Sequence, residues 1–149
     1  LRRQRQMCIR DRFNINTRTK ILREIYGDRP EIMIYALSDM TDENDICPEW
    51  GRYLLNNVDR YIYKNPELMI YGNDESRSGW FDKKDLANTA ELIVNRQDLP
   101  ISATMVREAM AKDDRKKWMS LVNPRLHKMY DVLRAELMSV PFYQELSKN

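Results

Sequence analysis

The sequence predicts an α/β fold with a mainly parallel sheet that helices cover on both faces. Short apolar runs typical of buried strands alternate with stretches whose apolar residues recur at helical spacing. The resulting order is helix, strand, helix, strand, strand and then helices to the end of the chain. A length of 149 residues, of which 42% are hydrophobic and 32% charged, suits one globular domain with a sizeable core.

The first two elements are a helix and a strand. In "INTRTKILREIYG" (residues 15–27), Asn16 or Thr17 can cap the start of a helix and Gly27 can cap its end. Its apolar side chains are predicted to share one face and are Ile21, Leu22, Ile25 and Tyr26. "EIMIYAL" (residues 31–37) then predicts a short buried strand.

A second helix and two further strands follow. Apolar residues recur at helical spacing from Trp50 to Ile62. "ELMIYG" (residues 67–72) predicts a strand that runs into a glycine turn, and "AELIVNR" (residues 90–96) predicts a third strand. The intervening segments "TDENDICP" and "NDESRSGW" are mostly polar and are expected to be loops.

The remainder of the chain predicts helices. One short helix carries Met105, and another carries Trp118 at the spacing of a packed helix face. The last helix begins at Asn123, a cap that is followed by proline at the first helical position. Its apolar stripe comprises Leu126, Met129, Tyr130, Leu133 and Leu137. "KDDRKK" (residues 112–117) mixes both signs of charge and is expected to be a solvated helix face.

The net charge of +2 hides an uneven distribution. Five arginines against one aspartate give residues 1–12 a charge of +4, which leaves −2 for the other residues. A basic arm of this kind is typical of proteins that bind nucleic acid. However, "RQMCIRDR" within the arm resembles translated sequencing adaptor. We therefore interpret residues 1–12 as an artefact or a disordered basic tail, assign residues 13–149 to one domain, and expect no nucleic-acid partner.

Cysteine content and hydropathy indicate the compartment. Cys8 and Cys47 are too few for a disulfide framework and favour a reducing cytoplasm. No apolar run approaches the roughly 20 residues that span a bilayer, so no membrane partner is expected. Two distant cysteines and one histidine also cannot form a zinc site.

The segment "LPISATMVREAM" (residues 99–110) predicts a helix start that binds an anion. Ser102 or Thr104 can open a helix, yet Arg107 then falls within its opening turn, where the helix dipole disfavours a cation. A bound phosphate would remove the conflict, because it accepts hydrogen bonds from the free N–H groups and pairs with the arginine. The alternative is that Ser102 or Thr104 only caps the helix while the Arg107 side chain extends into solvent.

Polar residues also follow the predicted strands. Asp39 comes after the first strand, Asn73 and Asp74 follow Gly72 at the end of the second, and Arg96 ends the third. Because ligands of open α/β sheets bind beyond the carboxyl ends of the strands, we expect these residues at one edge of the sheet. For Asp39, a solvated loop carboxylate is an equal alternative.

These stretches together resemble a known superfamily. "ISATMVR" is similar to the ISxTxxR signature of nucleotidyltransferases, which join a nucleotide to a phosphate-bearing partner and release pyrophosphate. "IVNRQDLPISATMVREAMAKDDRKKWMSLVNP" resembles the closing segment of the nicotinamide-mononucleotide adenylyltransferases within that superfamily. "ALSDM", "PEWGRYLLNNV" and "ELMIYGNDE" resemble preceding segments of the same family. The resemblance covers residues 13–138 and implies a Rossmann-like parallel sheet flanked by helices, with a C-terminal helical segment.

The resemblance implies a phosphate site on the ISxTxxR motif. Ser102, Thr104 and Arg107 would hold the triphosphate of ATP, which is a substrate. Arg107 would be the catalytic residue, because it would offset charge on the departing pyrophosphate. Mg²⁺ is expected to accompany ATP.

The remaining roles that the resemblance implies belong to the nucleotide and to the acceptor. Gly72 would let the backbone approach the nucleotide, and Asn73 and Asp74 would help to bind it. Trp50 would stack on the nicotinamide ring, and Arg96 would lie near the mononucleotide. For Trp50, a core or interface aromatic is the alternative.

One departure from the family changes the functional expectation. The family's His-x-Gly-His motif, which follows the first strand and binds phosphates, is absent, since the one histidine is His127 in the last predicted helix. His127 is expected to be a surface or helix-packing residue. The domain is therefore interpreted as a partial nucleotidyltransferase domain that lacks the first strand–helix unit, and this chain is expected to be inactive or nearly so.

Several functional assignments remain open. The first is a fragment of an enzyme that makes NAD from ATP and nicotinamide mononucleotide. The alternatives are an adenylyl- or cytidylyltransferase for another acceptor, such as pantetheine phosphate or glycerol phosphate, and a non-catalytic nucleotide-sensing module. An α/β interaction domain without a ligand is a further alternative. The expected partners are small nucleotides. A homo-oligomer is also possible, because related enzymes are often multimeric.

Overall fold

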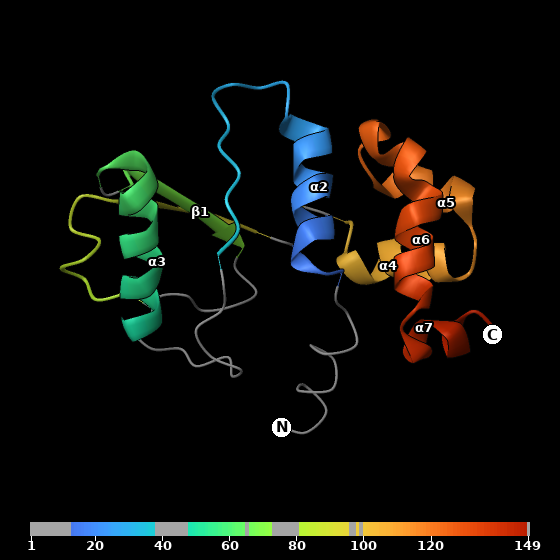
Figure 1. Ribbon diagram of the computed structural model, residues 1–149. Helices are drawn as coiled ribbons and strands as arrows, with labels where there is room; N and C mark the ends of the chain where they lie inside the picture. Colours follow the sequence, from blue (N-terminus) through green and yellow to red (C-terminus); the bar gives the residue numbers. More distant parts are fainter. Residues whose placement is uncertain are drawn as a thin grey trace. The chain divides into compact units, whose positions relative to one another are not determined.

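The computed structural model shows a mixed α/β chain that is mostly helical (Figure 1). It describes residues 13–37, 48–64, 66–72, 81–95, 98 and 100–148. The chain divides into two compact units, a helical unit of residues 1–36 and 101–149 and a sheet unit of residues 37–100. The predicted α/β class and the C-terminal helical segment are thereby confirmed.

The helical unit consists of one amino-terminal helix and a group of carboxyl-terminal helices (Figure 1). They are α2 (Ile15–Tyr26), α4 (Ala103–Ala111), α5 (Arg115–Leu121), the 3-10 helix η3 (Pro124–Met129), α6 (Tyr130–Met138) and α7 (Pro141–Leu146). Their buried side chains form one core, which comprises Ala109, Met110, Ala111, Trp118, Leu126, Tyr130, Leu133, Leu137 and Tyr143. The apolar stripe predicted for the last helix therefore faces this core, with Met129 packed at its margin.

The last predicted helix begins where the sequence indicates. Asn123 caps η3 by accepting a hydrogen bond from the Arg125 N–H at 3.0 Å, and Pro124 follows as the first helical residue. The first six residues form a 3-10 helix before the α-helical α6 begins at Tyr130. The predicted start is confirmed, and the predicted single helix is two elements.

Helix α2 begins earlier than predicted. The Asn14 side chain accepts a hydrogen bond from the Thr17 N–H at 3.0 Å, so Asn14 is the cap and the predicted caps Asn16 and Thr17 are wrong. Gly27 ends the helix as predicted and donates its N–H to the Arg23 carbonyl oxygen at 2.7 Å. A Cβ atom at Gly27 would collide with that oxygen, which explains the glycine.

The apolar residues of α2 divide between two faces. Ile21 and Ile25 are four residues apart and pack against the core. Leu22 and Tyr26 are 43% and 38% exposed, so of the four residues predicted to share one face only Ile21 and Ile25 pack against the core. Leu22 and Tyr26 each follow such a residue by one position, which on a helix is a rotation of about 100°.

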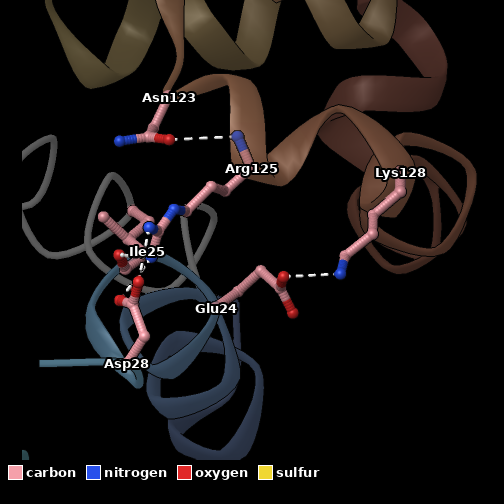
Figure 2. A network of polar contacts seen from close by, with 6 residues as sticks. All are labelled: Glu24, Ile25, Asp28, Asn123, Arg125 and Lys128. Atoms are coloured by element: carbon pink, nitrogen blue, oxygen red, sulfur yellow. Dashed lines mark hydrogen bonds and ion pairs between the residues drawn. The ribbon is translucent and has the colours of Figure 1, made fainter.

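Polar contacts hold both ends of α2 on the carboxyl-terminal helices. At its start, Glu136 of α6 accepts hydrogen bonds from the Asn14 N–H at 3.0 Å and from the Thr17 hydroxyl at 2.5 Å. At its end, Arg125 donates to both carboxylate oxygens of Asp28, at 2.5 and 2.6 Å (Figure 2). The hydrogen bonds from Arg125 lower the pKa of the Asp28 carboxyl.

Figure 2 also shows the neighbouring contacts at this end of α2. Arg125 Nη1 donates to the Ile25 carbonyl oxygen at 2.8 Å, and Lys128 Nζ lies 2.6 Å from Glu24 Oε1. Arg125 and Lys128 both belong to η3. Two cations on η3 therefore meet the last turn of α2, where the helix dipole favours positive charge.

Trp118 and Tyr130 lie at the centre of the helical unit. They are 1% and 2% exposed, and their ring centroids are 4.9 Å apart in an edge-to-face arrangement. The Tyr130 hydroxyl donates to Asp113 Oδ1 at 2.7 Å. Burial of the phenol, together with this hydrogen bond, raises the pKa of Tyr130 to about 12. The structural interpretation of Trp118 is thereby confirmed.

We expect Tyr130 to stay protonated as the pH passes the ordinary tyrosine pKa of about 10. Because its pKa is raised to about 12 in the folded protein, the folded state binds more protons than the unfolded state between these values. The stabilisation is complete below about pH 10 and is lost as the pH rises toward 12. The phenolate absorbance of the wild type minus that of Tyr130→Phe measures this pKa. A difference curve centred near 10 would contradict the expectation.

The sheet unit contains one helix and two strands. They are α3 (Pro48–Ile62), β1 (Leu68–Gly72) and β2 (Ala90–Val94). The strands are parallel neighbours, with Leu68 opposite Ala90 and Gly72 opposite Val94. The helix from Trp50 and the strands at residues 67–72 and 90–96 are confirmed, although the helix begins at Pro48 and the second strand ends at Val94.

Residues 31–37, predicted as a buried strand, are not a strand in the structure. Met33 and Tyr35 in this segment are 57% and 51% exposed. The apolar pattern suits a strand, but a strand also needs a partner for its backbone N–H and C=O groups. Among the described residues only β1 and β2 pair, and the strand predicted at residues 31–37 is therefore wrong.

The prediction that helices cover both faces of the sheet is not confirmed by the described residues of the sheet unit. Leu68, Ile70 and Leu92 share one face in the register of the two strands and are 49%, 62% and 51% exposed. On the other face Ile93 is 56% exposed. Parallel strands are normally buried on both faces, whereas these four apolar side chains are exposed.

Two neighbouring residues of α6 test the assignment of the core. Leu133 is 2% exposed and Val132 is 68% exposed. We expect Leu133→Ala to lower the free energy of unfolding by about 2–5 kcal/mol, because it removes buried methyl groups and leaves a cavity. The control Val132→Ala should change it by less than about 0.5 kcal/mol. Urea denaturation followed by far-UV circular dichroism measures both, and equal effects would contradict the core assignment.

Candidate functional site

The candidate site is the turn that opens α4. Ser102 has an extended backbone and its hydroxyl oxygen accepts a hydrogen bond from the Met105 N–H at 3.2 Å. Ser102 is therefore the helix cap, whereas Thr104 is the second helical residue and is exposed. Of the two residues predicted as possible caps, the structure confirms Ser102 and not Thr104.

Arg107 lies further into the helix than predicted. Since α4 begins at Ala103, Arg107 is its fifth residue and opens the second turn, so its placement in the opening turn is wrong. Side chains of a helix lean toward its amino terminus, and residues three apart share a face. An arginine at this position can therefore reach the space beyond Thr104 and the helix start.

The first turn of α4 retains groups that bind an anion. Ser102 satisfies the Met105 N–H, and the Ser102 carbonyl oxygen accepts from Val106 at 3.2 Å. The N–H groups of Ala103 and Thr104 precede the first intrahelical bond and have no acceptor among the described residues. The turn contains no acidic residue. The helix dipole and two free donors therefore favour a negatively charged ligand there.

The strand ends are described only in part. Gly72 and Val94 are register partners at the carboxyl ends of β1 and β2, so the two ends meet at one edge as predicted for Gly72. Asn73, Asp74, Arg96 and Asp39 lie outside the described residues.

The structure groups the predicted site residues in two sets. Ser102, Thr104 and Arg107 come together on the first two turns of α4 in the helical unit. Gly72 and Trp50 belong to the sheet unit, where Trp50 is a half-buried residue in the first turn of α3. This intermediate burial fits both the ligand and the packing interpretation of Trp50.

His127 packs within the helical unit. Its Nε2 atom lies 3.0 Å from the Met119 carbonyl oxygen, and its ring centroid is 6.1 Å from that of Trp118. Because a carbonyl oxygen only accepts, the contact assigns the Nε2 atom as the donor. The helix-packing interpretation is confirmed, and His127 does not belong to the α4 turn.

Residues 112–117 are all exposed, as predicted from their mixed charges, but only residues 115–117 are helical. Lys112 caps the end of α4, Asp114 caps the start of α5, and Asp113 between them binds Tyr130. The Asp114 side chain accepts a hydrogen bond from the Lys117 N–H at 2.9 Å. Aspartate is a preferred helix cap, so Asp114 is a signal for a helix start. An interpretation of the segment from its mixed charges alone misses this signal.

Metal and membrane features are not found in the part of the chain that the structure describes. It contains no group of three or more His, Cys, Asp or Glu side chains that could hold a metal ion. None of its helices combines the length and the apolar character needed to cross a membrane.

Comparisons with protein-family profiles, with curated proteins and with solved structures gave no match. The similarity to nucleotidyltransferases therefore stays a prediction from the sequence motifs.

We expect Ser102→Ala to lower the free energy of unfolding by about 1 kcal/mol, because the Met105 N–H loses its acceptor. Ser120→Ala is the control, since the Ser120 hydroxyl donates to the Lys117 carbonyl oxygen and caps no helix start. It should change stability by less than about 0.5 kcal/mol. Urea midpoints measure both variants, and an unchanged midpoint for Ser102→Ala would contradict the capping geometry.

Proposed function

We propose that this chain is part of a nucleotidyltransferase whose complete form transfers the adenylyl group of ATP to nicotinamide mononucleotide, giving NAD and pyrophosphate. The triphosphate of ATP would bind at the first turn of α4. The proposal depends on one observation above all: two free N–H groups, a favourable dipole and Arg107 occur on the same short stretch of helix. The resemblance to the ISxTxxR motif implies that the ligand of this turn is the triphosphate of ATP.

The sheet supports a finer proposal for the fold. β1 and β2 are parallel, and their carboxyl ends meet at one edge, where Gly72 lies opposite Val94. In open α/β sheets this is the side on which ligands bind. Apolar side chains exposed on β1 and β2 are what a Rossmann-like sheet without its neighbouring layers would have. We therefore propose a Rossmann-like domain that lacks its first strand–helix unit.

In the proposed reaction the protein mainly positions the substrates and stabilises the charge that develops on them. A phosphate oxygen of the mononucleotide attacks the α-phosphorus of ATP, and the bond to the bridging oxygen of pyrophosphate breaks with its electron pair. Arg107 and the Ala103 and Thr104 N–H groups would offset the charge that develops on pyrophosphate. The described residues form no cage for Mg²⁺, which would be held by phosphate oxygens and water.

The absent His-x-Gly-His motif limits what this chain can do. Its one histidine, His127, is engaged with Met119 and Trp118. Removal of one transition-state donor commonly costs about 10²–10³-fold in rate, so the loss of two histidines would leave little activity. We propose that this chain binds nucleotide without turning it over appreciably. This observation also favours the second candidate function, a non-catalytic nucleotide-sensing module.

A substitution that separates capping from anion binding tests the phosphate site. Aspartate caps helices as well as serine, so Ser102→Asp should keep the stability of the wild type. Its carboxylate would repel a phosphate, so binding of ATP or pyrophosphate should be lost. Isothermal titration calorimetry measures the affinity, and amide chemical shifts should locate the ligand at residues 103–107.

Arg107→Gln provides the second arm of this test. We expect it to weaken ATP binding about tenfold or more, the size of a lost charge-assisted hydrogen bond. Lys116→Gln removes the same charge from an exposed position of α5 and should leave the affinity near that of the wild type. Undiminished binding by both Ser102→Asp and Arg107→Gln, or no binding by the wild type, would refute the phosphate site.

A further inference from the structure

Asp113 directly follows Lys112, the cap of α4, and has a backbone conformation that is usually found for glycine. Its φ angle is 57°, in the left-handed region. The Asp113 N–H donates to the Met110 carbonyl oxygen at 3.2 Å, and the Asp114 N–H donates to that of Ala109 at 2.9 Å. In this pattern of helix ending, the left-handed residue is usually glycine, because a Cβ atom is disfavoured there. Aspartate is one of the few other residues that adopt this conformation, because its short polar side chain can form hydrogen bonds nearby.

The carboxylate of Asp113 joins the end of α4 to α6. Its Oδ1 atom accepts from the Tyr130 hydroxyl at 2.7 Å and lies 3.2 Å from Arg134 Nε. Arg134 Nε also lies 3.1 Å from the Met110 carbonyl oxygen, where the dipole of α4 favours a cation. The Asp113 side chain is 65% exposed, so the ion pair alone contributes little and the hydrogen bond from Tyr130 matters more.

The two halves of α4 have different surroundings. The buried residues Ala109, Met110 and Ala111 all lie in its carboxyl-terminal half. Ala103, Thr104 and Met105 in its first turn are exposed. An isolated helix of this length is not stable in water, so its order comes from packing at the buried end. The direction of the first turn therefore depends on how the last turn is held.

We propose that Asp113 is a positioning residue for the phosphate turn. By joining the last turn of α4 to Tyr130 and Arg134, it fixes the direction and the order of the first turn, which carries Ser102 and Arg107. The inference rests on the proposed function of that turn. Misplacement of binding groups by about 1 Å can cost about 10²-fold in the rate of a catalysed reaction, so an anchor distant from the ligand can matter.

Three substitutions separate the contributions of Asp113. Asp113→Gly suits the left-handed backbone but removes the carboxylate, and Asp113→Asn tolerates this backbone and keeps an acceptor oxygen for Tyr130. Tyr130→Phe removes the donor and keeps the ring. The matched control is Glu145→Gln, which removes an exposed acid that pairs with Lys148 in the same unit.

Two measurements on the full chain decide the proposal. Hydrogen exchange of the amides of residues 105–109 without ligand reports the order of α4, and calorimetry with ATP reports the affinity of its first turn. We expect Asp113→Gly and Tyr130→Phe to accelerate exchange and to weaken ATP binding by about fivefold, the size of one lost hydrogen bond. Asp113→Asn and Glu145→Gln should remain near the wild type.

The outcomes are distinguishable. Unchanged exchange in Asp113→Gly would overturn the proposal, because aspartate would then only tolerate the left-handed backbone. Faster exchange with unchanged ATP affinity would also overturn it, because Asp113 would then be structural alone. If the wild type does not bind ATP, the proposed function fails, and the exchange data alone decide whether Asp113 orders the first turn.

Discussion

The edge-to-face contact between Trp118 and Tyr130 is the interaction on which the helical unit depends. It is made at a cost, because the Trp118 Nε1 atom is buried and has no hydrogen-bond partner among the described residues. Such an unpaired donor costs about 1–3 kcal/mol. Two aromatic side chains bury about 150–250 Å² each, and at about 25 cal/mol per Å² this burial outweighs the cost. The pair therefore stabilises the unit despite the unsatisfied N–H group.

Tyr130 also contacts other helices, because it has both an apolar ring and a polar hydroxyl group. Its ring packs against Trp118 of α5 and lies 4.8 Å below the Arg115 guanidinium, while its hydroxyl binds Asp113 at the end of α4. One residue at the start of α6 thus fixes α5 through apolar contact and α4 through a hydrogen bond. Glu136 on the same helix binds the start of α2. Through these residues α6 contacts α4, α5 and α2 directly.

The sequence predicted those features whose signal is local. Asn123 before Pro124 indicated a helix start, and the repeat of Leu126, Tyr130, Leu133 and Leu137 indicated a buried face, because both depend on backbone geometry alone. The site residues Ser102, Thr104 and Arg107 were likewise predicted to be close, since helical spacing brings them together. The strand at residues 31–37 failed because its apolar pattern says nothing about whether a partner strand is present.

Asp113 shows a second limit of sequence reasoning. Its charge suggested a solvated position, yet its role follows from a left-handed φ angle and from Tyr130, which is 17 residues away in the sequence. Neither a rare backbone angle at a residue other than glycine nor a distant partner leaves a pattern in neighbouring residues. Contacts of this kind are found only in the folded chain.

The α4 turn resolves the conflict between its cap and its arginine in physical terms. A capped helix start and an anion site are often treated as alternatives, but Ser102 uses only the Met105 N–H. The donors of Ala103 and Thr104 point in the same direction and stay available. Arg107, one turn later, is far enough from the helix start to avoid most of the dipole's repulsion, which falls off within the first turn. Its side chain can still lean back toward that space, so cap, donors and cation could serve one negatively charged ligand together.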